Sequence, residues 1–233
     1  MIKALFFDLF GTVVDWRGSI INQLKKSKLS KKFQIDWEQF VVSWRLRYQP
    51  ILRKVNNNVY KWKILDELHE MTLKEVCNDM NIYGLTNQEK GYLIKLWHNL
   101  EPWNDSCLGI KKLNKYYITA TLSNGNIALQ KSLLENAKLK FEFIFSAEHF
   151  KKYKPAKIVY LGAVDYLNLK PKECALVASH KSDLSAASKL GLKTIYIERL
   201  NEYGKYKSLF KEIDFKADYE TNKITKILNI LSH

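Results

Sequence analysis

The chain has 233 residues, of which 46% are hydrophobic and 13% aromatic, with only 4 Pro and 9 Gly, so a disordered or collagen-like chain is excluded. Basic residues outnumber acidic ones by 38 to 24, and the formal net charge is +14. Because the lysines are dispersed and no nucleic-acid-binding module is recognisable, we interpret this charge as a solvated surface and expect no nucleic-acid partner.

Two further features indicate the compartment. No apolar run reaches the roughly 18 residues that a membrane span needs, and the start MIKALFFDLFGT lacks the order of a signal peptide. The three cysteines, Cys77, Cys107 and Cys174, are scattered and form no CxxC pair, which fits a reducing compartment. We therefore expect a cytoplasmic protein with no membrane partner.

Five short apolar runs predict buried strands. They are rich in β-branched and aromatic residues and lie at residues 2–7, 117–122, 141–145, 175–178 and 193–197. Helical patterns at 127–137, 156–167 and 184–190 separate the last four, in the alternation typical of a parallel sheet. The expected fold class is α/β, with a Rossmann-like parallel sheet.

The long interval between the first two predicted strands has a different pattern. It carries amphipathic helical periodicity, for instance at 37–55, 62–77 and 88–100. Turn-forming residues at 102–105 mark the return to the sheet. We interpret residues 16–107 as a helical cap domain inserted into an α/β core domain made of residues 1–15 and 108–233.

The stretch FFDLFGT, at residues 6–12, ends the first predicted strand with a single carboxylate. Asp8 follows the apolar run, and Gly11 and Thr12 come directly after it. In open α/β sheets the active crevice lies beyond the carboxyl ends of the strands, so Asp8 is a candidate catalytic residue. The alternative is an Asp that caps the following turn or helix.

Polar residues also follow the later predicted strands. SNGN begins at Ser123, SAEHFKKYKP delivers Lys154, and SHKSD ends in Asp183. Each motif alone is an ordinary turn or helix boundary. In a parallel sheet, however, they converge with Asp8 on one pocket, where a nucleophilic carboxylate finds a cation, hydrogen-bond donors and a second acid.

This arrangement resembles the haloacid dehalogenase (HAD) superfamily, in which a strand-end Asp, a Ser or Thr, a Lys and a further acid form the active site under a cap. More narrowly, the chain is similar to the L-2-haloacid dehalogenases (type II) in the segments DLFGTVVDWRGSI, WRLRYQP, LDELH, TLSNGN, YKPAKIVY and DLSAASKLG. The resemblance covers nearly the whole chain. It implies a Rossmann-like HAD core with an inserted helical cap, and it is compatible with a homodimer.

Two positions distinguish the branches of the superfamily. Its phosphatases carry a second Asp two residues after the nucleophile, where this chain has Phe10, and a magnesium-binding acid four residues before the position of Asp183, where it has Ser179. An alkoxide needs a proton to leave, whereas a halide does not. The resemblance therefore implies a dehalogenase that needs no metal and no cofactor.

The reaction implied by the resemblance converts a short (S)-2-haloacid to an (R)-2-hydroxyacid. Asp8 would displace halide from C2, and water would then cleave the resulting aspartyl ester. The further catalytic residues implied are Thr12, Lys154 and Asp183. The residues implied to bind the 2-haloacid or the halide are Leu9, Phe10, Arg45, Ser123, Asn124 and Tyr160.

Two of these assignments have named alternatives. Arg45 is chosen over Arg47 only because Trp44-Arg45 matches the family, since solvated arginines are common on cap helices. Where the family places a Ser and an Asn to position the hydrolytic water, this chain has Ala178 and His180. His180 is therefore a candidate catalytic residue, either as the base for that water or as a hydrogen-bonding strut.

Two other functions remain open from the sequence. One is a HAD-type phosphohydrolase with a displaced acid, and the other is a catalytically silent HAD-fold binding protein. His69 and His98 lie on amphipathic cap helices, where packing or surface positions are expected rather than metal ligation.

Overall fold

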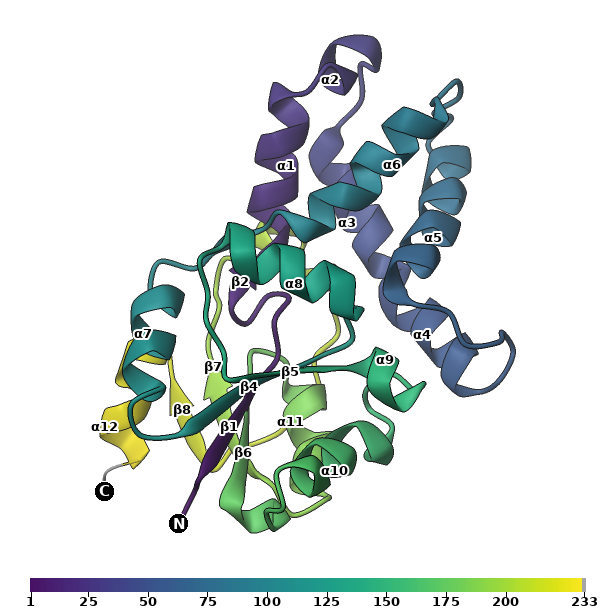
Figure 1. Cartoon of the computed structure of the whole chain (residues 1–233). Helices are drawn as coiled ribbons and strands as arrows, with labels where there is room; N and C mark the ends of the chain where they lie inside the picture. Colours follow the sequence, from purple (N-terminus) through teal and green to yellow (C-terminus); the bar gives the residue numbers. More distant parts are fainter. Residues whose placement is uncertain (232–233) are drawn as a thin grey trace.

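The computed structural model describes residues 1–231, and a six-stranded parallel sheet forms the centre of this part of the chain (Figure 1). The strand order is β5-β4-β1-β6-β7-β8. The strands are β1 (Ala4–Phe7), β4 (Ile118–Ser123), β5 (Phe143–Ser146), β6 (Cys174–Ala178), β7 (Lys193–Ile197) and β8 (Tyr219–Thr221). The predicted α/β fold is confirmed. Strand β8 is additional to the five predicted strands, since three residues are too few to form a recognisable pattern.

Both faces of the sheet are buried, which explains why the strands read as continuous apolar runs. Leu5 and Phe7 of β1 pack in one hydrophobic cluster, and Ala4 and Phe6 pack in another on the opposite face. The first cluster includes residues of α7 (Ser106–Leu113), α8 (Ile127–Asn136) and α12 (Ile227–Leu231). The second includes residues of α10 (Lys157–Tyr166) and α11 (Lys181–Ser188). Short helical segments complete this part: α9 (Ala147–Phe150), η2 (Pro171–Glu173), η3 (Gly204–Leu209) and η4 (Ile224–Lys226).

A helical body lies beyond the carboxyl ends of the strands, at the top of Figure 1. Its helices are α1 (Trp16–Lys26), α2 (Leu29–Lys32), α3 (Trp37–Leu46), α4 (Tyr48–Asn56), α5 (Leu65–Asp79), α6 (Asn87–Lys95) and η1 (Leu96–His98). The chain crosses between the two bodies at β2 (Val14–Asp15) and β3 (Glu101–Pro102), which pair antiparallel. The domain boundaries after residues 15 and 107 stay a prediction, and the second of them falls within α7, which packs on the sheet.

The predicted helix at 37–55 is two helices, α3 and α4, which meet at Arg47. The cause is Pro50, because it has no N–H to donate to the carbonyl of Leu46 and its ring would clash with that carbonyl in a continuous helix. Within α4, Pro50 lies in the first turn, where no intrahelical donor is needed. This break places Arg45 on one helix and Tyr48 on the next.

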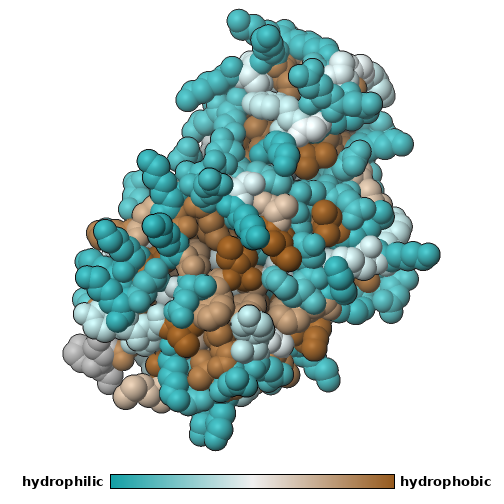
Figure 2. All heavy atoms as spheres, in the orientation of Figure 1, coloured by the Kyte–Doolittle hydropathy of each residue, from teal (hydrophilic) through white to brown (hydrophobic). Residues whose placement is uncertain are grey.

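The visible surface is largely hydrophilic (Figure 2). Figure 2 shows hydrophilic side chains over most of the visible face, with apolar residues gathered towards its middle and lower part. In residues 1–231 no helix is both long and apolar enough to span a membrane.

Candidate active site

Asp8 directly follows β1, between the neighbouring strands β4 and β6, and is 7% exposed. Its Oδ1 accepts a hydrogen bond from Lys154 Nζ at 2.9 Å, and its Oδ2 accepts one from Thr12 Oγ1 at 2.9 Å. His180 Nδ1 lies 3.2 Å from the same Oδ2. Burial alone would raise the pKa of Asp8, but the Lys154 charge and the contact with His180 outweigh it and hold the pKa well below its usual range. Asp8 is therefore ionised at neutral pH.

Lys154 bridges Asp8 to a second acid. Its Nζ lies 2.5 Å from Asp183 Oδ2, and the hydroxyl of Tyr160 donates to Asp183 Oδ1 at 2.5 Å. Burial would lower the pKa of Lys154, but the charges of Asp183 and Asp8 raise it well above its ordinary value. The backbone N–H of Lys154 donates to Asn124 Oδ1 at 2.8 Å, which fixes the loop after β5 against the loop after β4.

The structure thus brings together the predicted residues at four strand ends. Ser123 ends β4 and is fully buried, and its Oγ accepts the N–H of Gly125 at 3.1 Å. The side chains of Leu9 and Phe10 are buried directly after Asp8. Their backbone amides stay a prediction as donors to a substrate carboxylate.

Arg45, on α3, is 8% exposed and lies among aromatic rings. Its Cζ lies 4.1 Å from the Tyr48 ring centroid, 5.3 Å from that of Trp16 and 5.9 Å from that of Phe10. Within the described part of the chain, its Nη1 is buried and has no hydrogen-bond partner. A buried guanidinium with a free donor is suited to hold a small anion.

Arg47 lies on the cap surface instead. It forms ion pairs with Asp79 and with Glu75, and its Nη1 donates to the Ser43 carbonyl at 2.6 Å. The two arginines therefore have different environments, and only the one that matches the family motif is buried among aromatic rings.

Tyr48 is a site residue that the sequence analysis missed. It is buried beside Arg45, and burial raises the pKa of its hydroxyl, while the Arg45 charge and a hydrogen bond with Asn124 act in the opposite direction. It is therefore a neutral phenol at the boundary between cap and core. The helix break at Pro50 brings it there, so a pattern that predicts one continuous helix cannot reveal it.

His180 lies between two carboxylates, and the second of them was not predicted. Its Nε2 is 3.0 Å from Glu202 Oε1. Burial would lower the pKa of His180, but the charge of Glu202 and the contact with Asp8 raise it well above its ordinary value. His180 is therefore an imidazolium in this state, with both ring nitrogens donating.

Glu202 is buried in the loop after β7. Its Oε1 also accepts from Trp16 Nε1 at 3.0 Å, and its Oε2 lies 3.4 Å from Ser179 Oγ. Gly11 permits this position, because a Cβ at Gly11 would lie 2.1 Å from Glu202 Oε1 and because its φ of +88° favours glycine. The glycine of the FFDLFGT motif was the one sequence signal that a side chain approaches the backbone closely there.

At the two positions where the phosphatases of the superfamily carry acids, this chain has Phe10 and Ser179. The Phe10 ring packs edge-on against Trp97, with centroids 6.1 Å apart. Ser179 Oγ lies 3.1 Å from Thr12 Oγ1, and the Ser179 N–H donates to the same oxygen at 2.9 Å. The side chains of Lys154 and His180 contact the two oxygens of the Asp8 carboxylate.

The cap histidines pack as expected. The His69 ring stacks on Trp97 at 4.5 Å between centroids, and burial lowers its pKa to about 3. His98 Nε2 lies 3.0 Å from Asp66 Oδ1, and Asp66 Oδ2 accepts from Asn126 Nδ2 at 3.0 Å. This contact links η1 and α5 to the start of α8.

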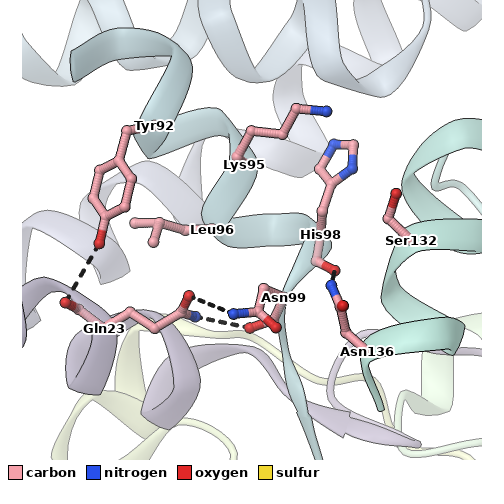
Figure 3. Close-up of a pocket in the computed structure, with 8 residues that line it drawn as sticks. All are labelled: Gln23, Tyr92, Lys95, Leu96, His98, Asn99, Ser132 and Asn136. Atoms are coloured by element: carbon pink, nitrogen blue, oxygen red, sulfur yellow. Dashed lines mark hydrogen bonds between the residues drawn. The ribbon is translucent and has the colours of Figure 1, made fainter. Parts of the chain in front are cut away.

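A separate pocket of about 370 Å³ opens between the cap and α8, and it contains none of the predicted site residues (Figure 3). Most of its lining residues have polar side chains; they are Gln23, Tyr92, Lys95, Leu96, His98, Asn99, Ser132 and Asn136. Asp8, Thr12 and Lys154 are instead buried.

These features define a Rossmann-like α/β core under a helical cap, with a strand-end aspartate as its candidate nucleophile. A model of the haloacid dehalogenase-like hydrolases matches residues 2–191, and the chain belongs to this family. It is 28% identical over 206 residues to (S)-2-haloacid dehalogenase 4A of Burkholderia cepacia, covering 85% of this chain and 84% of that protein.

Two solved structures are similar over almost their whole length. The L-2-haloacid dehalogenase PA0810 has a TM-score of 0.92 and 35% identity, covering 99% of this chain and 100% of the other. The defluorinating L-2-haloacid dehalogenase Rha0230 has a TM-score of 0.93 and 32% identity, covering 100% of this chain and 96% of the other. The family expected from the sequence motifs is thereby confirmed.

Proposed function

We propose that this enzyme hydrolyses the carbon–halogen bond of short (S)-2-haloacids and yields (R)-2-hydroxyacids. The observation that carries the proposal is an ionised Asp8, buried between two cations, together with a buried Arg45 that has a free donor. The family relationship and the names of the similar proteins support the same reaction.

The first step is a displacement at carbon. A carboxylate oxygen of Asp8 attacks C2 with inversion, the carbon–halogen bond breaks, and the halide leaves with the electron pair. Arg45 and Asn124 receive the halide, while Ser123 and the amides of Leu9 and Phe10 hold the substrate carboxylate. Negative charge that grows on the halogen is stabilised by a guanidinium that is already in place, so no side chain has to reorganise.

The second step is hydrolysis of the ester on Asp8. Water attacks the carboxyl carbon, the bond to the product oxygen breaks, and Asp8 is regenerated. Lys154, held by Asp183 and indirectly by Tyr160, keeps its charge beside the carbonyl oxygen throughout. This charge stabilises the oxyanion of the tetrahedral intermediate.

A halide-release screen tests this function. The substrates are chloroacetate, bromoacetate, fluoroacetate and both enantiomers of 2-chloropropionate, with p-nitrophenyl phosphate plus magnesium as the phosphatase arm. Of the two enantiomers of 2-chloropropionate we expect only the (S)-form to release halide, and we expect no phosphate release. Phosphate release without halide release would instead identify a phosphohydrolase, and no turnover of any compound would identify a silent member of the fold.

We expect a chelator to leave halide release unchanged. The support for this prediction is local: Phe10 and Ser179 stand where the phosphatases of the superfamily carry acids, and Lys154 and His180 already balance the charge of Asp8. The measurement compares initial rates before and after incubation with EDTA, and after magnesium is added back. A rate that falls with EDTA and returns with magnesium would refute metal independence.

We expect Arg45→Lys to lower both kcat and kcat/KM for halide release by about a hundredfold, because a guanidinium that stabilises the departing charge acts mainly in the transition state. Arg47→Lys is the matched control, since Arg47 pairs with acids on the cap surface. Its kcat should stay within about twofold of the parent value. Equal damage from both substitutions would argue against a halide site at Arg45.

A further inference from the structure

Glu202 belongs to none of the motifs that suggest the reaction, yet it is the most completely buried carboxylate in contact with the site. Its side chain is 2% exposed, and it is directed at His180 rather than at the substrate pocket. Three groups hold it there: Trp16 Nε1 and His180 Nε2 both contact Oε1 at 3.0 Å, and Ser179 Oγ contacts Oε2 at 3.4 Å. A buried carboxylate is costly unless it is paired, so this position calls for a role.

We propose that Glu202 is a positioning residue for hydrolysis of the Asp8 ester: it accepts a hydrogen bond from the Nε2–H of His180 and so holds Nδ1 beside the ester, where Nδ1 takes a proton from the attacking water. The inference rests on the proposed function, because it concerns the second step of that reaction. It decides between the two roles that the sequence left open for His180.

The geometry of the ring supports this assignment. His180 is the N-cap residue of α11, and its Nδ1 lies 3.2 Å from Asp8 Oδ2 while Nε2 faces Glu202 on the opposite edge. A carboxylate on Nε2 fixes the ring orientation and selects the tautomer in which Nδ1 can become a free acceptor. If His180 served only as a neutral hydrogen-bonding group, it would need no buried carboxylate at Nε2.

The charge on Asp8 controls when His180 can act as a base. While Asp8 is ionised it holds a proton on Nδ1, so the ring has no lone pair for water. Ester formation removes the negative charge of Asp8. Glu202 is then the carboxylate that still contacts the imidazole of His180. The Nδ1 proton then leaves to solvent, which the 20% exposed side chain of His180 can reach.

The protons balance over the cycle. Ester formation releases halide, and His180 releases one proton. Attack of water on the ester carbon then returns a proton to Nδ1 and leaves a hydroxyl on that carbon. When the carbon–oxygen bond to the product breaks, the alkoxide takes the remaining hydroxyl proton, so that the hydroxyacid, ionised Asp8 and the imidazolium are formed. The net release is one halide and one proton, and no oxidant or metal is involved.

Other charged groups near the ring do not replace Glu202. The phenols of Tyr203 and Tyr196 interact electrostatically with His180, and burial raises the pKa of each to about 12, so both are neutral in the assay range. Lys154 lies on the far oxygen of Asp8 and is paired with Asp183. Within residues 1–231, the carboxylates in contact with the imidazole are those of Asp8 and Glu202.

The test is the pH dependence of kcat in Glu202→Gln. Glutamine keeps an oxygen for Trp16 and His180 and removes the charge. Loss of that charge lowers the pKa of His180 in the ester state, and a base must be unprotonated, so the acidic limb of kcat should move to lower pH by about one unit or more. The plateau should fall about tenfold because the base is weaker. If Glu202 has a purely structural role, Glu202→Gln will change the melting temperature but will not shift the acidic limb of the pH dependence of kcat.

Two measurements locate the effect in the second step. A single-turnover burst of halide should keep its rate within about threefold of the parent in Glu202→Gln, while intact-protein mass spectrometry shows the ester accumulating on Asp8. Glu198→Gln is the matched control, since Glu198 is an exposed carboxylate directly after β7. It should move neither the limb nor the amount of ester.

A double-variant comparison keeps the inference testable if one variant is unstable. His180→Asn should abolish the acidic limb, and adding Glu202→Gln to it should cost no further activity if both residues act through one proton transfer. Additive losses, or a limb unchanged in Glu202→Gln, would overturn the role of Glu202 while leaving the dehalogenase function intact. Absence of halide release from the parent would instead reject the proposed function itself.

Discussion

Asp8→Asn is expected to reduce halide release from 2-haloacids by about a thousandfold or more, because an amide cannot displace the halide and no other carboxylate lies at the end of β1. The comparison uses initial rates of halide release by parent and variant at equal concentration. Asp165→Asn is the control, since Asp165 is an exposed acid on α10. Activity of Asp8→Asn within about tenfold of the parent would exclude Asp8 as the nucleophile.

A label experiment on the parent enzyme separates nucleophilic attack from simple charge stabilisation. In a single turnover in heavy-oxygen water with enzyme in excess, hydrolysis at the ester carbon leaves the label in Asp8. Mass spectrometry of the peptide that contains Asp8 measures this label. Label found only in the hydroxyacid would mean that water attacks C2 directly, and the aspartyl ester would be rejected.

Lys154→Met is expected to have the second largest effect, on stability as well as on catalysis. The substitution leaves Asp8 and Asp183 facing each other without the cation between them, and both are about nine-tenths buried. Removing one partner of a buried ion pair typically costs about 3–5 kcal/mol, which denaturant unfolding can measure. Because burial then acts on Asp8 with less opposition, its pKa rises, and any remaining halide release should increase with pH.

Two further variants show whether charge is the cause. Lys193→Met removes a lysine whose ion pair with Asp218 is half-exposed, so it should cost less than about 1 kcal/mol. Adding Asp183→Asn to Lys154→Met removes one of the two opposed carboxylates and should restore part of the stability without restoring activity. If the double variant is less stable than the single one, the loss arises from packing rather than from unpaired charge.

The sequence predicts the core of this site well because strand ends are easy to recognise. Asp8, Lys154 and Asp183 each follow an apolar run, and in a parallel sheet such positions meet at one edge whatever the intervening loops do. Tyr160 lies in the same cluster, where its hydroxyl donates to Asp183, and its expected role in binding the substrate stays a prediction. For these residues, the sequence pattern and the sheet topology predict the same location, at the carboxyl edge of the sheet.

Glu202 and Tyr48 could not be predicted for two different physical reasons. Glu202 lies in an irregular loop after β7, where no periodicity relates sequence position to the direction of a side chain. Tyr48 is directed inward only because a proline ends one helix and starts another. Strand β8 was missed because three residues carry too little pattern.

The pairing of β1 determines when activity appears as the chain folds. Ala4 pairs with Ile118 on one side and with Cys174 on the other, so β1 has no partner close to it in the sequence. Such non-local pairing carries a large loop-closure cost and forms slowly, whereas the helices of the inserted segment depend on nearby contacts. On refolding, helical circular dichroism should therefore return before halide release. A nascent chain on the ribosome is catalytically inert until the strand that contains Cys174 has emerged.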